Sequence, residues 1–288
     1  MDWADPRTIS GLQQVLAKVG GRPNKRLGQN FLIDPKEFEE IARAIKETNP
    51  VWVLEIGAGP GGLTGSLLER GLEVVAIEID STWSRWLSSS LLTHYPQSLE
   101  IVEADALNVS WQEMANDKGG PWTICGNLPY SMTSPILFRL LEDTRSWSAA
   151  VFMVQKEVAE RLLAEPGNRD TSALSVLLRY AADVKGLKAV SRHAFYPSPK
   201  VDSFVIQLTR IPSPAVPFEA FKWSVHAAFS HRRKMIRQSL SKAPGSMWSA
   251  GKWEQILIEG GLDPLKRAEA LSWADWIRLA TIVATKMR

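Results

Sequence analysis

Cysteine is the scarcest chemistry-bearing residue in this sequence. Cys125 is the only one among 288 residues, and the four histidines are scattered along the chain. A single thiol cannot form an internal disulfide or a thiolate zinc cluster. This usage is typical of proteins from a reducing compartment, so we expect a cytoplasmic location and no metal centre.

Long apolar runs are also missing. No stretch reaches about 18 apolar residues, so we expect no membrane-spanning helix and no membrane partner. Residues 1–7 lack the basic-then-apolar pattern of a secretory signal. With 45% hydrophobic and 23% charged residues, the composition is ordinary for a globular protein. The length allows one large domain or two unequal ones.

Charge is distributed unevenly along the chain. Residues 211–288 hold 12 Lys and Arg against 6 Asp and Glu, a net charge of +6. The remaining 22 Lys and Arg and 25 Asp and Glu give −3 for residues 1–210. A basic C-terminal part favours a polyanionic partner. On charge alone, a solvated basic face is an equally good interpretation.

The most informative stretch begins at Val51. Residues 51–56 form an apolar run with β-branched residues, which predicts a buried strand, and residues 63–70 then predict a helix. Between them, Gly57, Gly59 and Gly62 form a turn where a ligand could approach the backbone closely. The same spacing fits S-adenosylmethionine (SAM) binding, the dinucleotide pattern G-x-G-x-x-G, or a tight turn without a ligand.

Further strands alternate with helical stretches. The expected strands cover residues 73–80, 99–106, 122–127, 149–155 and 203–210. This alternation predicts an α/β fold with a mostly parallel, doubly wound sheet, in which ligands bind outside the carboxyl ends of the strands. Four polar or glycine residues fall at such ends: Gly57, Glu78, Asp105 and Asn127. The Glu78 carboxylate could accept hydrogen bonds from both hydroxyls of a ribose.

A proline-rich segment at residues 211–217 predicts a domain boundary. We expect an α/β domain over residues 1–212, with a flexible N-terminal segment 1–34, and a helical domain over residues 217–288. Two basic clusters could contact phosphates. They comprise Arg22, Lys25 and Arg26 near the N-terminus, and Arg232, Arg233, Lys234 and Arg237 in the helical domain.

The segment Asn127-Leu128-Pro129-Tyr130 follows the fourth strand of the run. An Asn side-chain oxygen and a backbone carbonyl can accept the two N–H bonds of an adenine amine and stabilise the positive charge that develops during methylation. Tyr130 can stack on the base, and Phe195 is the expected second aromatic face, with Tyr196 as the alternative. The segment contains no general base, and methyl transfer from a sulfonium requires none.

Four ordered motifs carry a specific resemblance. They are residues 25–34, 55–64, 127–130 and 195–203, and together they resemble the rRNA adenine dimethyltransferases. The tail segments 228–240 and 267–272 are similar to the small-subunit branch of that family, known as KsgA or RsmA. The resemblance implies a Rossmann-like class I SAM-dependent methyltransferase domain followed by a small, all-helical, rRNA-binding domain.

The resemblance also implies functional residues and a substrate. Its SAM site comprises Asn30, Leu32, Gly57, Gly59, Glu78, Asp105, Ala106 and Asn127. Within that site, Glu78 holds the ribose and Asp105 the adenine amino group. The implied catalytic residues are Asn127, Leu128, Pro129, Tyr130 and Phe195. The implied substrate is a pair of adjacent adenosines in the 3′-terminal hairpin loop of 16S rRNA, dimethylated within the assembling 30S subunit by a monomeric enzyme.

Three other interpretations remain open at this stage. A macrolide-resistance methyltransferase would use the same catalytic motif on 23S rRNA, although the tail motif at residues 232–240 favours the small-subunit branch. An NAD-dependent oxidoreductase would share the glycines and Glu78, but would give the Asn127 segment no role. A non-catalytic RNA-binding assembly factor could keep the whole fold.

Overall fold

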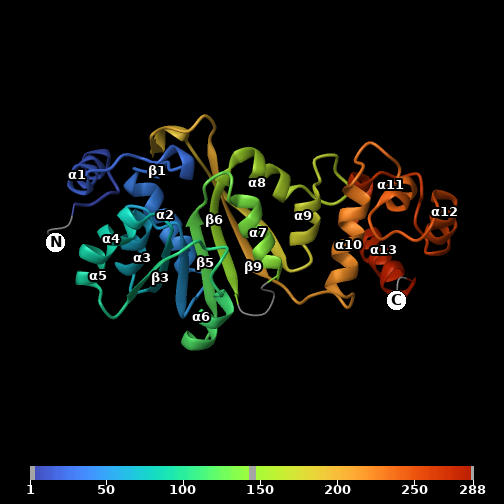
Figure 1. The fold of residues 1–288 in the computed structure, drawn as a ribbon, viewed down its shortest axis with the longest axis horizontal. Coiled ribbons are helices and arrows are strands. Elements are labelled where there is room, and N and C mark those ends of the chain that lie inside the picture. Colours follow the sequence, from blue (N-terminus) through green and yellow to red (C-terminus); the bar gives the residue numbers. More distant parts are fainter. Residues whose placement is uncertain (1–3, 143–146, 287–288) are drawn as a thin grey trace. The chain divides into compact units, whose positions relative to one another are not determined.

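A seven-stranded sheet is the main element of the fold (Figure 1), with strand order β4-β3-β2-β5-β6-β9-β7. Strands β2 to β6 pair in parallel, and β9 runs antiparallel to β6. The strands are β2 (Trp52–Ile56), β3 (Glu73–Glu78), β4 (Leu99–Glu103), β5 (Trp122–Asn127), β6 (Ala149–Gln155), β7 (Ala182–Val190) and β9 (Ser203–Arg210). This computed structural model describes residues 4–142 and 147–286, with the side chain of Lys25 left out.

The mostly parallel sheet predicted from the sequence is therefore confirmed, but three strands were not anticipated. Short strands β1 (Phe31–Leu32) and β8 (Phe195–Tyr196) pair antiparallel in a separate sheet. Strand β7 lies at one edge of the large sheet, and only its two end residues are buried. Its sequence alternates charged residues and a glycine with small apolar ones, so it lacks the continuous apolar run of a central strand.

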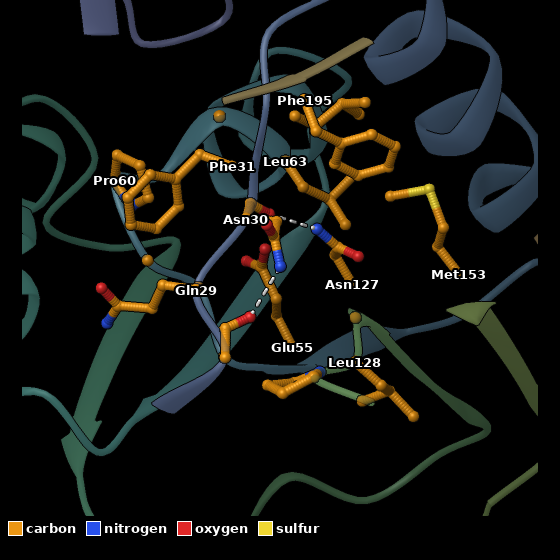
Figure 2. A pocket seen from close by; sticks show the side chains of 18 of the residues that line it. Gln29, Asn30, Phe31, Glu55, Pro60, Leu63, Asn127, Leu128, Met153 and Phe195 are labelled. Carbon is orange, nitrogen blue, oxygen red and sulfur yellow. Dashed lines mark hydrogen bonds between the residues drawn. The ribbon is translucent and has the colours of Figure 1, made fainter. Parts of the chain in front are cut away.

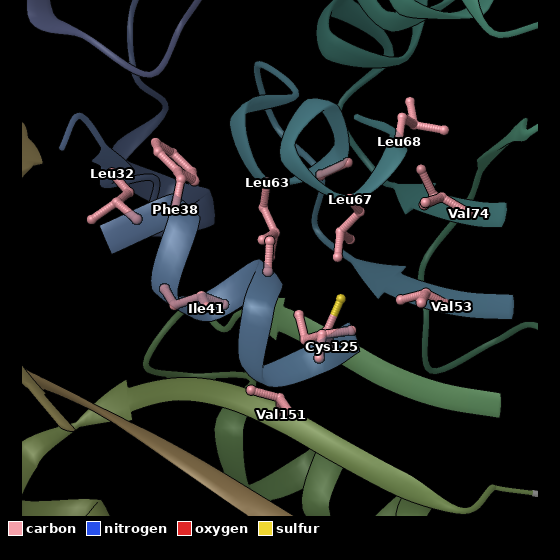
Figure 3. Close-up of a cluster of buried hydrophobic side chains, with 14 of the residues drawn as sticks. Leu32, Phe38, Ile41, Val53, Leu63, Leu67, Leu68, Val74, Cys125 and Val151 are labelled. Carbon is pink, nitrogen blue, oxygen red and sulfur yellow. The ribbon is translucent and has the colours of Figure 1, made fainter. Parts of the chain in front are cut away.

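Helices α2 and α3 cover one face of the sheet. Figure 3 shows Phe38 and Ile41 of α2, with Leu63 and Leu67 of α3, packed over Val53, Val74, Cys125 and Val151 of the strands. Successive residues of a strand point to opposite faces. Leu54 and Ile124 therefore face the other side of the sheet, where they are also fully buried. Burial on both faces explains why these strands read as continuous apolar runs.

Local sequence signals set the ends of the helices. Asp34 caps α2 by accepting a hydrogen bond from Lys36 N, and Pro35 takes the first helical position. Gly20 ends α1 in the left-handed conformation. The helices up to β6 are α1 (Ile9–Val19), α2 (Pro35–Lys46), α3 (Gly62–Leu68), α4 (Ser81–Ser89), α5 (Leu91–His94), α6 (Trp111–Lys118) and α7 (Thr133–Glu142).

The second part of the molecule is helical. Helix α10 packs on α9, α11 and α13, and Tyr180 packs against Phe218 and Phe221 while its hydroxyl donates to Val216 O at 2.6 Å. Ser272 and Asp275 exchange hydrogen bonds as a capping pair at the start of α13. These helices are α9 (Ala173–Leu178), α10 (Phe218–Phe229), α11 (Ile236–Lys242), α12 (Ala250–Glu259) and α13 (Trp273–Lys286).

The division into units differs from the predicted boundary. The first unit comprises residues up to Ala159 together with Lys185–Arg210, and the second comprises Glu160–Val184 together with residues from Ile211 onward. The chain passes between the two units three times, and our predicted boundary near residue 212 matches only the last of these passages. Residues 160–184, which we assigned to the first domain, belong to the second unit. Most of α8 (Lys156–Leu163) and all of α9 belong to the helical unit, because Tyr180 and α9 pack on α10.

Candidate functional site

A cavity of about 130 Å³ lies at the carboxyl ends of β2, β3, β5 and β6. This is the edge at which parallel α/β sheets bind ligands. Its lining combines the ends of these strands, the glycine turn, the N-terminal loop and β8. Figure 2 shows side chains from these segments pointing toward a common space. Three of the four strand-end residues predicted from the sequence, Gly57, Glu78 and Asn127, therefore line one cavity.

The glycine turn leaves part of the cavity wall without side chains. Gly57 and Gly59 have φ values of +75° and +52°, in the left-handed region that favours glycine. A Cβ at Gly57 would meet nothing within 4 Å, whereas one at Gly59 would lie 3.3 Å from the Phe31 ring. Gly57 is held by its own N–H, which donates to Ile77 O at 2.8 Å. A ligand can thus lie directly against this backbone.

Glu78 ends β3 with its carboxylate fixed from both sides. Oε2 accepts the N–H of Gly59 at 2.7 Å, and Oε1 accepts that of Asp80 at 2.8 Å. Each oxygen keeps acceptor capacity for a further donor. Burial raises the pKa of this carboxyl, and the two backbone donors oppose that shift. The arrangement suits an acceptor of two vicinal hydroxyls.

Glu55 is a second acid in the cavity wall, and our sequence reasoning did not assign it a role. It is only 2% exposed, and Thr64 Oγ1 donates to its Oε2 at 2.6 Å. Burial raises its pKa to about 7. The hydrogen bond from Thr64 favours the ionised carboxylate and so opposes that shift. The available signal was a lone carboxylate within an apolar strand, one residue before the end of that strand.

Asn127 ends β5, and its side chain is oriented by the N-terminal loop. Its Nδ2 donates to the backbone carbonyl of Asn30 at 3.1 Å, as the dashed line in Figure 2 shows. A carbonyl can only accept, so this bond identifies which end of the amide is the nitrogen. The Oδ1 acceptor is left for a ligand. Leu128, Pro129 and Tyr130 follow along the same wall of the cavity.

Phe195 rather than Tyr196 lines the cavity. The two residues are consecutive in β8, where Phe195 pairs with Leu32 and Tyr196 with Phe31. Side chains alternate along a strand, so one of the two points inward and the other outward. Phe195 is buried, while Tyr196 is 38% exposed and does not line the cavity. Figure 2 shows Phe195 among the side chains that line the cavity, together with Met153 and Asn127.

Asp105 and Ala106 are not brought into the cavity wall. They follow β4, the strand beside β3, and Ala104 N donates to Glu78 O at 3.1 Å. The Asp105 carboxylate accepts the N–H of Leu107 at 2.9 Å and so shapes its own turn. Of the eight residues expected to bind SAM, the cavity is lined by six: Asn30, Leu32, Gly57, Gly59, Glu78 and Asn127.

The predicted basic residues fall into three groups. Arg22 and Arg26 are exposed in the loop before the cavity, and the side chain of Lys25 lies outside the described part. In the helical unit, the exposed ones are Arg232, Arg233 and Lys234. Arg237 differs from these, because its Nη1 lies 2.7 Å from Glu254 Oε2 in a partly buried ion pair. This ion pair joins α11 and α12, and the assignment of Arg237 as a phosphate contact stays a prediction.

Residues 4–142 and 147–286 contain neither a candidate membrane helix nor a candidate metal cluster. No helix there is long and apolar enough to cross a membrane. No group of three or more His, Cys, Asp or Glu side chains in this range is placed to hold a metal ion.

Comparisons with known proteins point to one family. A family model described as ribosomal RNA adenine dimethylase matches residues 20–285. A ribosomal RNA small subunit methyltransferase A from Thermobifida fusca is 38% identical over 288 residues, covering 97% of either chain. A dimethyladenosine transferase from Plasmodium falciparum superposes with a TM-score of 0.72 and 28% identity, over 86% of this chain and 95% of that one. The 23S rRNA methyltransferase ErmE superposes with a TM-score of 0.67 and 27% identity, over 88% of this chain and 99% of that one.

Proposed function

Because this chain belongs to the ribosomal RNA adenine dimethylase family, we propose that it dimethylates two adjacent adenosines in the 3′-terminal hairpin loop of 16S rRNA. The methyl donor is SAM, and the acceptor is the exocyclic amine of each adenine. The proposed setting is the cytoplasm, on an assembling small ribosomal subunit, with the protein acting as a monomer. The fold is that of class I methyltransferases, extended by a helical C-terminal region.

The cavity fits the parts of SAM. Glu78, with one backbone donor on each oxygen, would accept the two ribose hydroxyls. The open backbone at Gly57 would lie against the methionine part, with Asn30 and Leu32 closing over it. When bound there, the sulfonium supplies an electrophilic methyl group and a neutral leaving group. Asp105 keeps its proposed role at the adenine amino group and Ala106 its proposed place in the SAM site, for which their loop would have to approach the ligand.

The orientation of Asn127 is the observation that carries the proposal. With Nδ2 bonded to Asn30 O, the Oδ1 acceptor is available to one N–H of an adenine amine. The carbonyl of Leu128 or Pro129 would accept the other N–H. Two acceptors would hold the amine nitrogen with its lone pair toward the methyl group and stabilise the positive charge that develops there. Such positioning is worth roughly 7–11 kcal/mol of barrier when reacting groups are well aligned.

Aromatic side chains would hold the base. Tyr130 is 37% exposed at the mouth of the cavity, and Phe195 lies inside it. A base taken out of an RNA loop could stack on either ring, and unpaired loop bases are the ones that proteins can extract at low cost. Arg22, Lys25 and Arg26 near the mouth, and Arg232, Arg233 and Lys234 in the helical unit, would contact phosphates.

The proposed function is tested by methyl transfer. Purified protein and labelled SAM would be incubated with small subunits lacking the dimethyladenosines, with large-subunit rRNA and DNA alongside. We expect label on two adjacent adenosines near the 3′ end of 16S rRNA, two methyl groups on each, mapped by mass spectrometry of nuclease fragments.

Two outcomes would contradict this expectation. Label confined to large-subunit rRNA would keep the chemistry and replace the substrate, as the similarity to ErmE allows. Absence of label from every nucleic acid, with SAM still bound, would support a non-catalytic assembly factor. Subunits that already carry the modification serve as the control and should accept no label.

A further inference from the structure

The side chain of Gln29 is bonded at both ends, although no chemical role had been expected for it. Its Oε1 accepts the N–H of Asn24 at 2.8 Å, and its Nε2 donates to Asp80 Oδ2 at 3.0 Å. The backbone N–H of Gln29 also donates to Asn24 O at 3.2 Å. One amide therefore closes the turn over residues 24–29 and fastens that turn to the end of β3.

Asp80 provides a fixed point for this bond. Its N–H donates to Glu78 Oε1, and its Oδ1 accepts the N–H of Thr82 at 3.0 Å as the N-cap of α4. Both attachments belong to regular structure, so Oδ2 has little freedom. Asp80 does not line the cavity. Gln29 itself does line it, so a change at Asp80 is the one that alters the contact without removing a group of the cavity wall.

The residue after Gln29 controls the catalytic amide. Asn30 O accepts from Asn127 Nδ2, and this bond alone distinguishes the two orientations of the Asn127 amide. The Asn30 carbonyl lies between two fixed points of the chain: Gln29, bonded to Asp80, comes before it, and Phe31, paired with Tyr196, comes after it. In Figure 2 the Gln29 side chain extends away from Asn127, so it acts on that residue only through the loop.

We propose that Gln29 is a positioning residue for methyl transfer. Its bond to Asp80 sets the place of the Asn30 carbonyl, which in turn directs Asn127 Oδ1 toward the target amine. The same connection joins Glu78, the acid assigned to the SAM ribose, to the amide assigned to the adenine. The inference rests on the proposed function, and it adds a link between the donor and acceptor halves of that site.

The test exchanges the two ends of the bond. Gln29→Glu places a carboxylate against Asp80, which removes the donor and adds like-charge repulsion. We expect the single-turnover methylation rate to fall roughly 10-fold or more, because small displacements of reacting groups are costly. Hydrogen–deuterium exchange of residues 24–32 should become faster in the ligand-free protein, a readout that does not depend on activity.

The double variant Gln29→Glu with Asp80→Asn restores the bond between positions 29 and 80 with donor and acceptor exchanged, and keeps the other two bonds as they are. The amide at position 80 donates to the carboxylate at position 29, which still accepts from Asn24. The oxygen of the same amide continues to cap α4. We expect both the rate and the exchange to return to within about twofold of the wild type. Gln13→Glu, the same chemical change at an exposed position of α1, is the matched control and should alter neither.

Specific results would overturn the inference. Gln29→Glu with wild-type rate and exchange would show that the loop needs no such tie. A double variant as slow as the single one would show that the bond to Asp80 is not what matters. A wild-type protein that methylates no rRNA would instead refute the proposed function, and the exchange measurement would then still test the tie itself.

Discussion

At the scale of single residues, hydrogen bonds to the backbone fix the orientation of the polar side chains in the proposed site. Asn127 is fixed by a backbone carbonyl, and Glu78 by two backbone N–H groups. Polar groups prepared in this way need little rearrangement when charge develops near them. In the proposed mechanism, catalysis thus depends on acceptors placed before the substrate arrives, with no metal ion or general base assigned to it.

Replacement of Asn127 tests this directly. Asn127→Ala removes one acceptor of the target amine and the bond to Asn30 O. We expect kcat to fall by about 10²- to 10³-fold, the usual decrease when one such polar group is removed. Equilibrium binding of SAM and of small subunits should stay measurable. A variant with wild-type turnover would exclude the assigned role.

Glu55 predicts a pH dependence of stability. Burial raises its pKa from an ordinary value of 4.5 to about 7 in the folded protein. Between these two values the folded state therefore binds more protons than the unfolded state, so stability falls as the pH rises through this window. The contribution is on the order of 3 kcal/mol, fully present below pH 4.5 and lost above about pH 7.

The measurement compares the wild type with Glu55→Gln, which cannot ionise. Free energies of unfolding from urea titrations at pH 4 to 8 should show the wild type losing stability relative to the variant as pH increases. The Thr64 hydroxyl can donate to the amide oxygen of the variant, so that bond is preserved. A pH-independent difference between the two proteins would show that Glu55 does not titrate in this range.

At the scale of elements, the glycine turn also permits close packing of helices. Gly62 begins α3, and a Cβ there would lie 2.5 Å from Cζ and 2.9 Å from Cε1 of Phe38 on α2. The Phe38 ring is buried in the core shown in Figure 3, with little room to move. This glycine therefore serves the packing of two helices as well as the ligand turn.

Gly62→Ala should destabilise the first unit by about 1–3 kcal/mol, the usual cost of overpacking. Chemical denaturation monitored by circular dichroism would measure it. The double variant Gly62→Ala with Phe38→Leu should recover part of the stability, because the shorter side chain leaves room for the new methyl group.

Gly251→Ala is the control: a Cβ there meets nothing within 4 Å in helix α12, and the change should stabilise the protein slightly. An equal destabilisation by Gly62→Ala in the Phe38→Leu background would contradict this account.

At the scale of the whole molecule, positive charge is concentrated in the C-terminal part of the chain. Arg232, Arg233 and Lys234 are exposed there, while Arg237 is paired with Glu254. Exposed cations that contact phosphate release counterions when they bind, and their number sets the salt dependence of affinity. The three exposed residues of this cluster are therefore the ones whose removal we expect to change the salt dependence.

Changing Arg232, Arg233 and Lys234 together to Gln should weaken binding to small subunits and flatten its salt dependence. The slope of log K against log salt should decrease by about 1 for each phosphate that the variant no longer neutralises, up to about 3. A matched control changes three exposed lysines of the first unit to Gln: Lys18, Lys46 and Lys185. An unchanged slope in the first variant would remove this segment from the interface.

The sequence by itself determined most of the fold and the chemistry. Buried parallel strands read as apolar runs, caps such as Asp34 and Ser272 satisfy local backbone groups, and glycines mark the turn at β2. These signals are local, because neighbouring residues in the chain create them. The edge strand β7 was missed since its exposed side chains give no apolar run.

Only the tertiary structure decided contacts between distant segments. In the structure Phe195 lines the cavity and Tyr196 does not, and Asp105 lies outside the cavity wall. Arg237 pairs with Glu254, and residues 160–184 belong to the helical unit. It also brought Gln29 to Asp80 and Asn30 to Asn127 across 51 and 97 positions of the chain. Such contacts depend on packing and strand register, which set the distance between residues far apart in sequence and leave no local pattern to read.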